Sequence, residues 1–65
     1  MELREALEEI VDKTAHLLTL SHELKLSFAL KDTLHVKQVV TRIKSTLGEL
    51  EELMKVVEDG LPKDA

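Results

Sequence analysis

The three histidines offer the widest chemistry in this sequence, because an imidazole can bind a metal ion or exchange a proton near neutral pH. They are His16, His22 and His35, and the chain contains no cysteine. A helix brings two histidines to one metal ion when they stand three or four positions apart. No pair has that spacing, although His22 and His35 would approach each other if the chain folded back between them. We therefore expect neither a metal site nor another cofactor.

The remaining polar residues give little support to catalysis. A catalytic serine needs a base and a group that orients that base, and no serine in the sequence has such a pattern around it. Carboxylates are numerous, but they occur as Glu8-Glu9 and within residues 49–52, a distribution typical of a solvated helix face. The sequence also has no glycine-rich phosphate loop. We therefore expect the protein not to be an enzyme.

Length and composition predict a small helical protein that gains stability by association. A chain of 65 residues forms one domain, and a domain of this size buries only about 60% of the surface that its unfolded chain exposes. Such domains usually need a disulfide, a metal ion or a second subunit, and a chain without cysteine cannot use the first. The composition, with 13 leucines, one phenylalanine and neither tryptophan nor tyrosine, favours helices over strands.

The sequence shows no sign of a membrane span or of an export signal. No apolar run approaches the roughly 18 residues of a membrane-spanning helix. The N-terminal segment MELREALEEI is acidic and lacks the basic start and apolar centre of a signal peptide. We expect a cytoplasmic protein with no membrane partner.

Residues 18–30, LTLSHELKLSFAL, carry apolar side chains at nearly every second position, which is typical of a half-buried strand. The same residues also belong to a longer helical pattern, in which apolar positions are spaced alternately by four and three. The longer pattern outweighs the shorter one, and we predict an all-α fold. The expected core seam comprises Leu3, Leu7, Ile10, Leu17, Leu24, Phe28, Val36, Val40, Ile43, Leu47, Leu50, Met54 and Val57.

The two halves of this seam are mirror images about Asp32, which predicts an antiparallel helical hairpin in a single domain of residues 1–65. We expect the first helix at about 2–30, a turn near 31–33, the second helix at about 33–59, and a frayed tail at 60–65. Gly60 is expected to end the second helix in a left-handed conformation. One unbroken helix remains an alternative, because neither glycine nor proline stands at the turn.

Further apolar residues lie beside the seam and predict an interface. A second hairpin would cover them and complete a four-helix bundle. This candidate interface comprises Val11, Leu18, Leu20, Leu26, Leu30, Val39, Leu53 and Val56. By contrast, Lys37, Lys44, Glu51 and Glu58 form a charged edge of the second helix.

Charge is divided between the two ends of the predicted hairpin. Residues 1–16 and 48–65, at the open end, carry eleven acidic and four basic side chains, whereas residues 17–47 carry two acidic and five basic ones. We therefore expect a homodimer with its turns at opposite ends, which places each acidic end beside a basic one. The basic residues also form a candidate nucleic-acid contact set, disfavoured by the net charge of −4: Lys25, Lys31, Lys37, Arg42 and Lys44.

In length and seam layout the chain resembles the plasmid copy-number regulator Rop, a hairpin that dimerises into a four-helix bundle and binds paired RNA loops. The long acidic-ended helices are also similar to those of flagellar export chaperones. The sequence thus leaves three functions open: a protein-interaction or assembly module that self-associates, an adaptor or chaperone-like subunit that binds a different protein, and a small RNA- or DNA-binding regulator.

Overall fold

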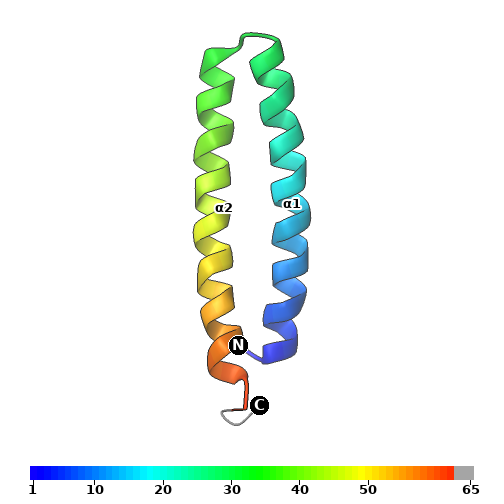
Figure 1. Cartoon of the computed structure of the whole chain (residues 1–65), viewed down its shortest axis with the longest axis vertical. Coiled ribbons are helices and arrows are strands. Elements are labelled where there is room, and N and C mark those ends of the chain that lie inside the picture. Colours follow the sequence, from blue (N-terminus) through cyan, green and yellow to red (C-terminus); the bar gives the residue numbers. More distant parts are fainter. Residues whose placement is uncertain (63–65) are drawn as a thin grey trace.

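The computed structural model of the chain describes residues 1–62 and contains two helices in this range, α1 (Leu3–Ala29) and α2 (Thr33–Gly60). They run antiparallel and pack against each other along their length, so the molecule is a hairpin 51 Å long (Figure 1). The predicted all-α hairpin is confirmed, and the chain is not one unbroken helix. Of the expected tail, residues 63–65 lie outside the described part.

The alternating segment at residues 18–30 is helical up to Ala29, as the longer pattern predicts. The helix begins at Leu3, where the amide of Ala6 donates to the carbonyl oxygen of Glu2 at 3.0 Å. Glu5 lies in the first turn of α1, where a carboxylate interacts favourably with the positive end of the helix dipole. No glycine or proline interrupts residues 3–29, so the helix continues without a kink-forming residue.

A left-handed residue ends α1 and reverses the chain. Lys31 has φ of 59°, and its amide donates to the carbonyl oxygen of Phe28 at 3.0 Å. The next amide, of Asp32, donates to the carbonyl oxygen of Ser27 at 3.0 Å. This pair of bonds is a Schellman motif, which satisfies the last carbonyl groups of a helix. A lysine occupies this left-handed position, which is usually glycine. The sequence therefore contains no glycine that would indicate the turn.

Asp32 starts α2 immediately after closing α1. Its carboxylate accepts a hydrogen bond from the amide of His35 at 3.1 Å, and its carbonyl oxygen accepts from the amide of Val36 at 2.9 Å. An aspartate at this position satisfies an amide that the helix itself cannot reach. Asp32 therefore caps the second helix, and a connection of three residues, 30–32, suffices for the turn.

The prediction for Gly60 is wrong, because this residue is the last of α2 and has no positive φ. The chain leaves the helix at Leu61, whose amide donates to the carbonyl oxygen of Glu58 at 3.3 Å and whose backbone is extended. Gly60 lies against α1, because a Cβ built on it would stand 3.5 Å from a methyl carbon of Leu3. Gly60 and Leu3 thus bring the two helices together at the open end of the hairpin.

The helices meet along a line of residues spaced alternately by three and four, which we call the inner seam. Each member is buried or half-buried. The inner seam comprises Leu3, Ala6, Ile10, Lys13, Leu17, Leu20, Leu24 and Ser27 of α1, and Val36, Val39, Ile43, Thr46, Leu50, Leu53 and Val57 of α2.

Two hydroxyl groups are buried in the inner seam, and both have hydrogen-bond partners. The Ser27 hydroxyl donates to the carbonyl oxygen of Glu23 at 2.9 Å, and that of Thr46 donates to the carbonyl oxygen of Arg42 at 2.9 Å. Bonding to the preceding turn of the same helix removes most of the cost of burying a hydroxyl group. These two hydroxyl groups therefore need no partner across the hairpin.

The inner seam differs from the predicted core seam at every second position. Leu7, Phe28, Leu47 and Met54 were expected in the core, but they are exposed, and Val40 is half-buried. Instead, three residues predicted for the interface lie between the helices: Leu20, Val39 and Leu53. The other predicted core residues do belong to the inner seam: Leu3, Ile10, Leu17, Leu24, Val36, Ile43, Leu50 and Val57.

The difference is a rotation of both helices about their own axes. At three positions the inner seam carries a small or polar residue, Ala6, Ser27 or Thr46, beside a larger apolar neighbour, Leu7, Phe28 or Leu47. A pattern based on apolar character selects the larger neighbour there. Position 20 shows the reverse, because the seam residue is Leu20 and its neighbour is Ser21, so side-chain size accounts for part of the displacement.

The inner seam predicts which of two leucines on α1 is essential for stability. Replacing Leu20, which is 2% exposed, by alanine should lower the free energy of unfolding by about 2–5 kcal/mol, because it leaves a cavity. Replacing Leu26, which is 61% exposed, should change it by about 0.5 kcal/mol or less. Urea unfolding followed by circular dichroism measures both. Equal losses for the two variants would contradict the inner seam.

The turn predicts a stabilising substitution. Lys31→Gly should raise the free energy of unfolding by up to about 1 kcal/mol, because glycine adopts positive φ without the steric cost that a lysine side chain incurs. Lys25→Gly, in the regular part of α1, is the matched control and should destabilise by about 1 kcal/mol. Thermal unfolding of the two variants gives the comparison. A destabilised Lys31→Gly protein would contradict the left-handed turn.

Candidate interaction surface

The two long sides of the hairpin differ in chemistry. One side, which we call the polar edge, carries the interhelical ion pairs. Nε2 of His35 lies 2.8 Å from Oε1 of Glu23, and the ammonium group of Lys13 pairs with the carboxylate of Glu49. These contacts join α1 to α2 near the turn and near the open half, so the polar edge reinforces the hairpin.

Lys13 links the inner seam to the polar edge. Its stem is half-buried between the helices, and its ammonium group reaches Glu49. The hydrogen bond with that carboxylate raises the pKa of Lys13 above its usual value, and the charges of Glu49, Glu9 and Asp12 act in the same direction. The lysine is therefore charged throughout the neutral range, and a polar residue occupies a seam position without leaving a buried charge unpaired.

The opposite side of the hairpin, which we call the apolar face, exposes large hydrophobic side chains. The fractional exposure reaches 75% for Phe28, 67% for Val11 and 61% for Leu18. In an antiparallel pair of helices, the positions that flank the seam on one side of α1 lie beside the corresponding positions of α2. The apolar face comprises Leu7, Val11, Leu18 and Phe28 of α1, and Val40, Leu47 and Met54 of α2.

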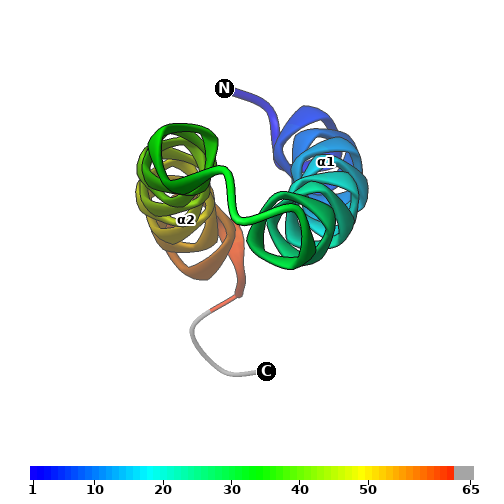
Figure 2. The same cartoon turned by 90° about the horizontal axis from the view of Figure 1, so that it is seen from above.

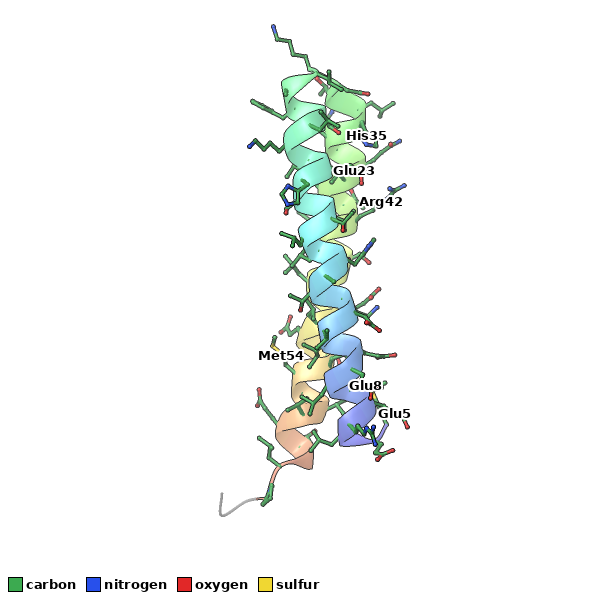
Figure 3. All side chains as sticks on the ribbon, turned by 90° about the vertical axis from the view of Figure 1, so that its right-hand side faces the viewer. Glu5, Glu8, Glu23, His35, Arg42 and Met54 are labelled. Carbon is green, nitrogen blue, oxygen red and sulfur yellow. The ribbon has the colours of Figure 1, made fainter. Side chains whose placement is uncertain are left out.

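The side chains themselves show this division. In Figure 3, Met54 projects from one side of the hairpin, whereas Arg42 projects from the opposite side. Seen along the helix axes, α1 and α2 form a single layer of two helices (Figure 2). In the described part of the chain, no third element lies over the apolar face, and its side chains meet solvent.

The exposed area is large for a chain of this size. The hairpin has an accessible surface of 5281 Å², whereas a compact monomer of 7.4 kDa is expected to expose about 4,200 Å². The excess of about 1,000 Å² compares with the roughly 800 Å² that each partner buries at a standard protein interface. The shape of the chain thus leaves enough surface for one stable interface.

The turn end of the apolar face contains an open groove of about 340 Å³, lined by Phe28, Lys31, Thr33 and Val36. Phe28 is the chain's one aromatic residue, and its ring forms a wall of the groove while remaining mostly exposed. Concave apolar surface next to a basic side chain suits an apolar side chain from a segment that also carries acidic groups. The groove therefore belongs to the apolar face and extends it to the turn.

The predicted interface residues fall into three groups. Val11 and Leu18 lie on the apolar face, whereas Leu26 and Leu30 are exposed but lie elsewhere. The others lie between or beside the helices: Leu20, Val39 and Leu53 are buried, and Val56 is half-buried. Leu34, which is 68% exposed, was predicted neither for the core seam nor for the interface. An isolated exposed leucine is common on protein surfaces and gives no signal by itself.

The five basic residues of the nucleic-acid prediction are all exposed, but they do not share one surface. Lys37 and Lys44 are seven positions apart, beside the apolar face, whereas Arg42 lies on the polar edge. Lys25 lies on α1, and Lys31 lies in the turn. A phosphate backbone would meet only part of this set at a time.

The hydroxyl groups of Ser21 and Ser27 bond within their own helix, and His35 contacts the other helix. The Ser21 hydroxyl donates to the carbonyl oxygen of Leu18 at 2.7 Å, as Ser27 does to Glu23. His16 and His22 are exposed, and His35 pairs with Glu23. Among residues 1–62, no three histidine, aspartate or glutamate side chains lie close enough together to hold a metal ion.

Comparison of the chain with known proteins gives no match to a family model, to a curated protein or to a solved structure. Neither helix within residues 1–62 combines the length and hydropathy that crossing a membrane requires. The apolar face of the hairpin is therefore the feature from which we infer a function.

Proposed function

We propose that the protein is a non-enzymatic assembly module that forms a homodimer through the apolar face, so that two hairpins make a four-helix bundle. The observation that carries this proposal is the group of large exposed apolar side chains on one side of the hairpin, from Leu7 to Met54. Large exposed apolar patches mark interaction sites on soluble proteins, and in this one the exposed Thr14 and Ser21 lie between Leu7 and Phe28. A second copy presents the same patch, and a two-fold axis brings the two patches together.

The apolar face is large enough to drive association. Fully burying a leucine, valine, methionine or phenylalanine side chain contributes about 1.5–3 kcal/mol, and each copy contributes seven such side chains. Association costs an estimated 4–15 kcal/mol in lost freedom of motion. Burial of two faces exceeds that cost even when the side chains are only partly covered, so the dimer does not depend on ion pairs.

The distribution of charge favours turns at opposite ends of the bundle. The open end carries a net charge of −7, with eleven acidic and four basic side chains, and the turn end carries +3, with five basic and two acidic ones. Parallel packing would place like charges together, whereas opposed packing places each acidic end beside a basic one. Exposed charges contribute little to affinity, but they select between two arrangements that bury similar apolar area.

An adaptor that binds a helix of a different protein would use the same face. This alternative differs from the proposal in one measurable respect, since the isolated chain would then be a monomer. Nucleic-acid binding has weaker support, because the basic residues lie on several surfaces and no exposed aromatic side chain stands among those on α2.

Two leucines of equal exposure test the proposed interface. Leu18 and Leu26 are both on α1 and both 61% exposed, but only Leu18 belongs to the apolar face. Leu18→Glu should weaken the dimer at least about tenfold, because a carboxylate would be buried against the second copy. Leu26→Glu should leave the dissociation constant within a factor of about two, as expected for a surface change. Sedimentation equilibrium at several concentrations measures both constants.

A monomeric parent protein at tens of micromolar would exclude self-association and favour the adaptor. Equal effects of the two substitutions would show that the dimer forms through another surface. Circular dichroism checks that both variants remain helical, and we expect no change because neither leucine lies in the inner seam.

Crosslinking in the turn tests the direction of packing. The chain has no cysteine, so Leu30→Cys introduces a single thiol in the exposed turn. With opposed turns, the two thiols lie about 40 Å apart, one helix length at 1.5 Å per residue, and a short bis-maleimide cannot join them. Leu47→Cys, at mid-length on the apolar face, is the control, because it lies level with its counterpart in either direction. Efficient crosslinking of Leu30→Cys within dilute dimers would contradict opposed packing.

A further inference from the structure

Four charged residues form a row on α2, beside the apolar face. Lys37, Lys44, Glu51 and Glu58 stand seven positions apart, so they follow one side of the helix, with a drift of about 20° around the axis per heptad. All four are exposed, and within residues 1–62 none of them takes part in an ion pair. The row runs parallel to Val40, Leu47 and Met54, which supply the apolar face of α2.

The sign of charge in this row reverses at its centre. Two lysines occupy the half near the turn, and two glutamates occupy the half near the open end. An antiparallel copy of α2 laid beside the row places Lys37 next to Glu58 and Lys44 next to Glu51. The centre of these pairs falls between Leu47 and Gly48. The neighbouring apolar residues match in the same way, with Val40 beside Met54 and Leu47 beside its own counterpart.

The corresponding row on α1 has its centre at the same level. It contains Val11 and Leu18, whose midpoint falls between Thr14 and Ala15. In the open half of the hairpin, Lys13 pairs with Glu49 and Leu3 lies beside Gly60, so facing residue numbers add to 62 or 63 there. Nearer the turn, the long side chains of Glu23 and His35 meet although their numbers add to 58. The centre of the charged row is therefore level with residue 14.5 or 15.5 of α1. One two-fold axis, perpendicular to the helices, passes through both centres.

Packing with both turns at one end mismatches the same rows. It would bring α1 beside α2 of the second copy, with Leu18 level with Lys44 and Val11 level with Glu51. Lys25 would then lie level with Lys37, and only Arg4 would meet an opposite charge, at Glu58. Opposed packing leaves one unfavourable pair, Arg4 with Lys25, and Arg4 already pairs with Glu8 of its own helix at 3.4 Å.

We propose that the second copy packs α2 against α2 and α1 against α1, in a register fixed by the charged row. Lys37 pairs with Glu58 of the second copy and Lys44 pairs with Glu51, at the outer margin of the α2 contact. Val11 meets Leu18 of the second copy at the margin of the α1 contact. This register rests on the proposed self-association, which supplies the apolar contact, and adds the specificity that excludes other alignments.

Charge exchange within the row tests the register. Lys44→Glu and Glu51→Lys, each alone, place like charges together twice per dimer, and each should raise the dissociation constant about tenfold at low salt. The double variant Lys44→Glu/Glu51→Lys restores opposite charges and should dimerise as the parent does. A mixture of the two single variants should form mainly heterodimers, which native mass spectrometry resolves when one variant is isotopically labelled.

Lys55→Glu and Glu52→Lys are the matched controls, because both residues are exposed on α2 and pair with each other within one helix at 3.4 Å. Their mixture should give the statistical proportion of heterodimer. A statistical mixture of Lys44→Glu and Glu51→Lys, from a parent that is dimeric, would overturn the register and leave self-association intact. A parent that does not dimerise at all would overturn the proposed function and the register together.

Discussion

A layer of two helices can bury only one stripe of each helix, and the rest of this structure depends on that limit. Apolar side chains also occupy positions next to that stripe, such as Leu7 and Leu47. The hairpin covers the inner seam, from Leu3 to Val57. The neighbouring positions, from Leu7 to Met54, form the apolar face. Helices with such a wide stripe are typical of bundles in which each helix has two neighbours.

The contact between α1 and α2 combines small residues, Ala6, Ser27 and Thr46, with large ones such as Leu20 and Leu53. The apolar face carries large groups, Phe28, Leu47 and Met54 among them. Polar contacts, of His35 with Glu23 and of Lys13 with Glu49, occupy the opposite side of the hairpin. We therefore expect a partner to contact the hairpin on its apolar face.

Much of the fold could be predicted from the sequence, because long helices carry a strong periodic signal. The position of the turn followed from the mirrored pattern about Asp32, the residue that caps α2. The left-handed residue could not be predicted, because a lysine holds it in place of glycine. The seam was displaced by one position in two because Leu7 and Leu47 give a stronger hydrophobic signal than Ala6 and Thr46. Periodicity shows that a stripe is apolar but does not show which part meets which neighbour.

The candidate surface was predicted in outline and not residue by residue. A surplus of apolar side chains predicted an interface, and Val11 and Leu18 are exposed on the apolar face, outside the inner seam. Leu20, Val39 and Leu53 lie instead between the helices. They were predicted for the interface because neighbouring residues had been predicted for the seam. The charged row was visible in the sequence, but its symmetry has meaning only once α1 and α2 are placed level with each other. That level comes from contacts such as Lys13 with Glu49.

Isotope-filtered nuclear Overhauser spectroscopy on a mixture of labelled and unlabelled chains tests most directly whether a second copy covers the apolar face. The signals report only contacts between methyl groups of different chains. If a second copy covers the apolar face, we expect such contacts for Leu18, Leu47 and Met54, and none for Leu26 or Leu34. Interchain contacts at Leu26 and Leu34 alone, or none at any methyl group at millimolar concentration, would contradict it.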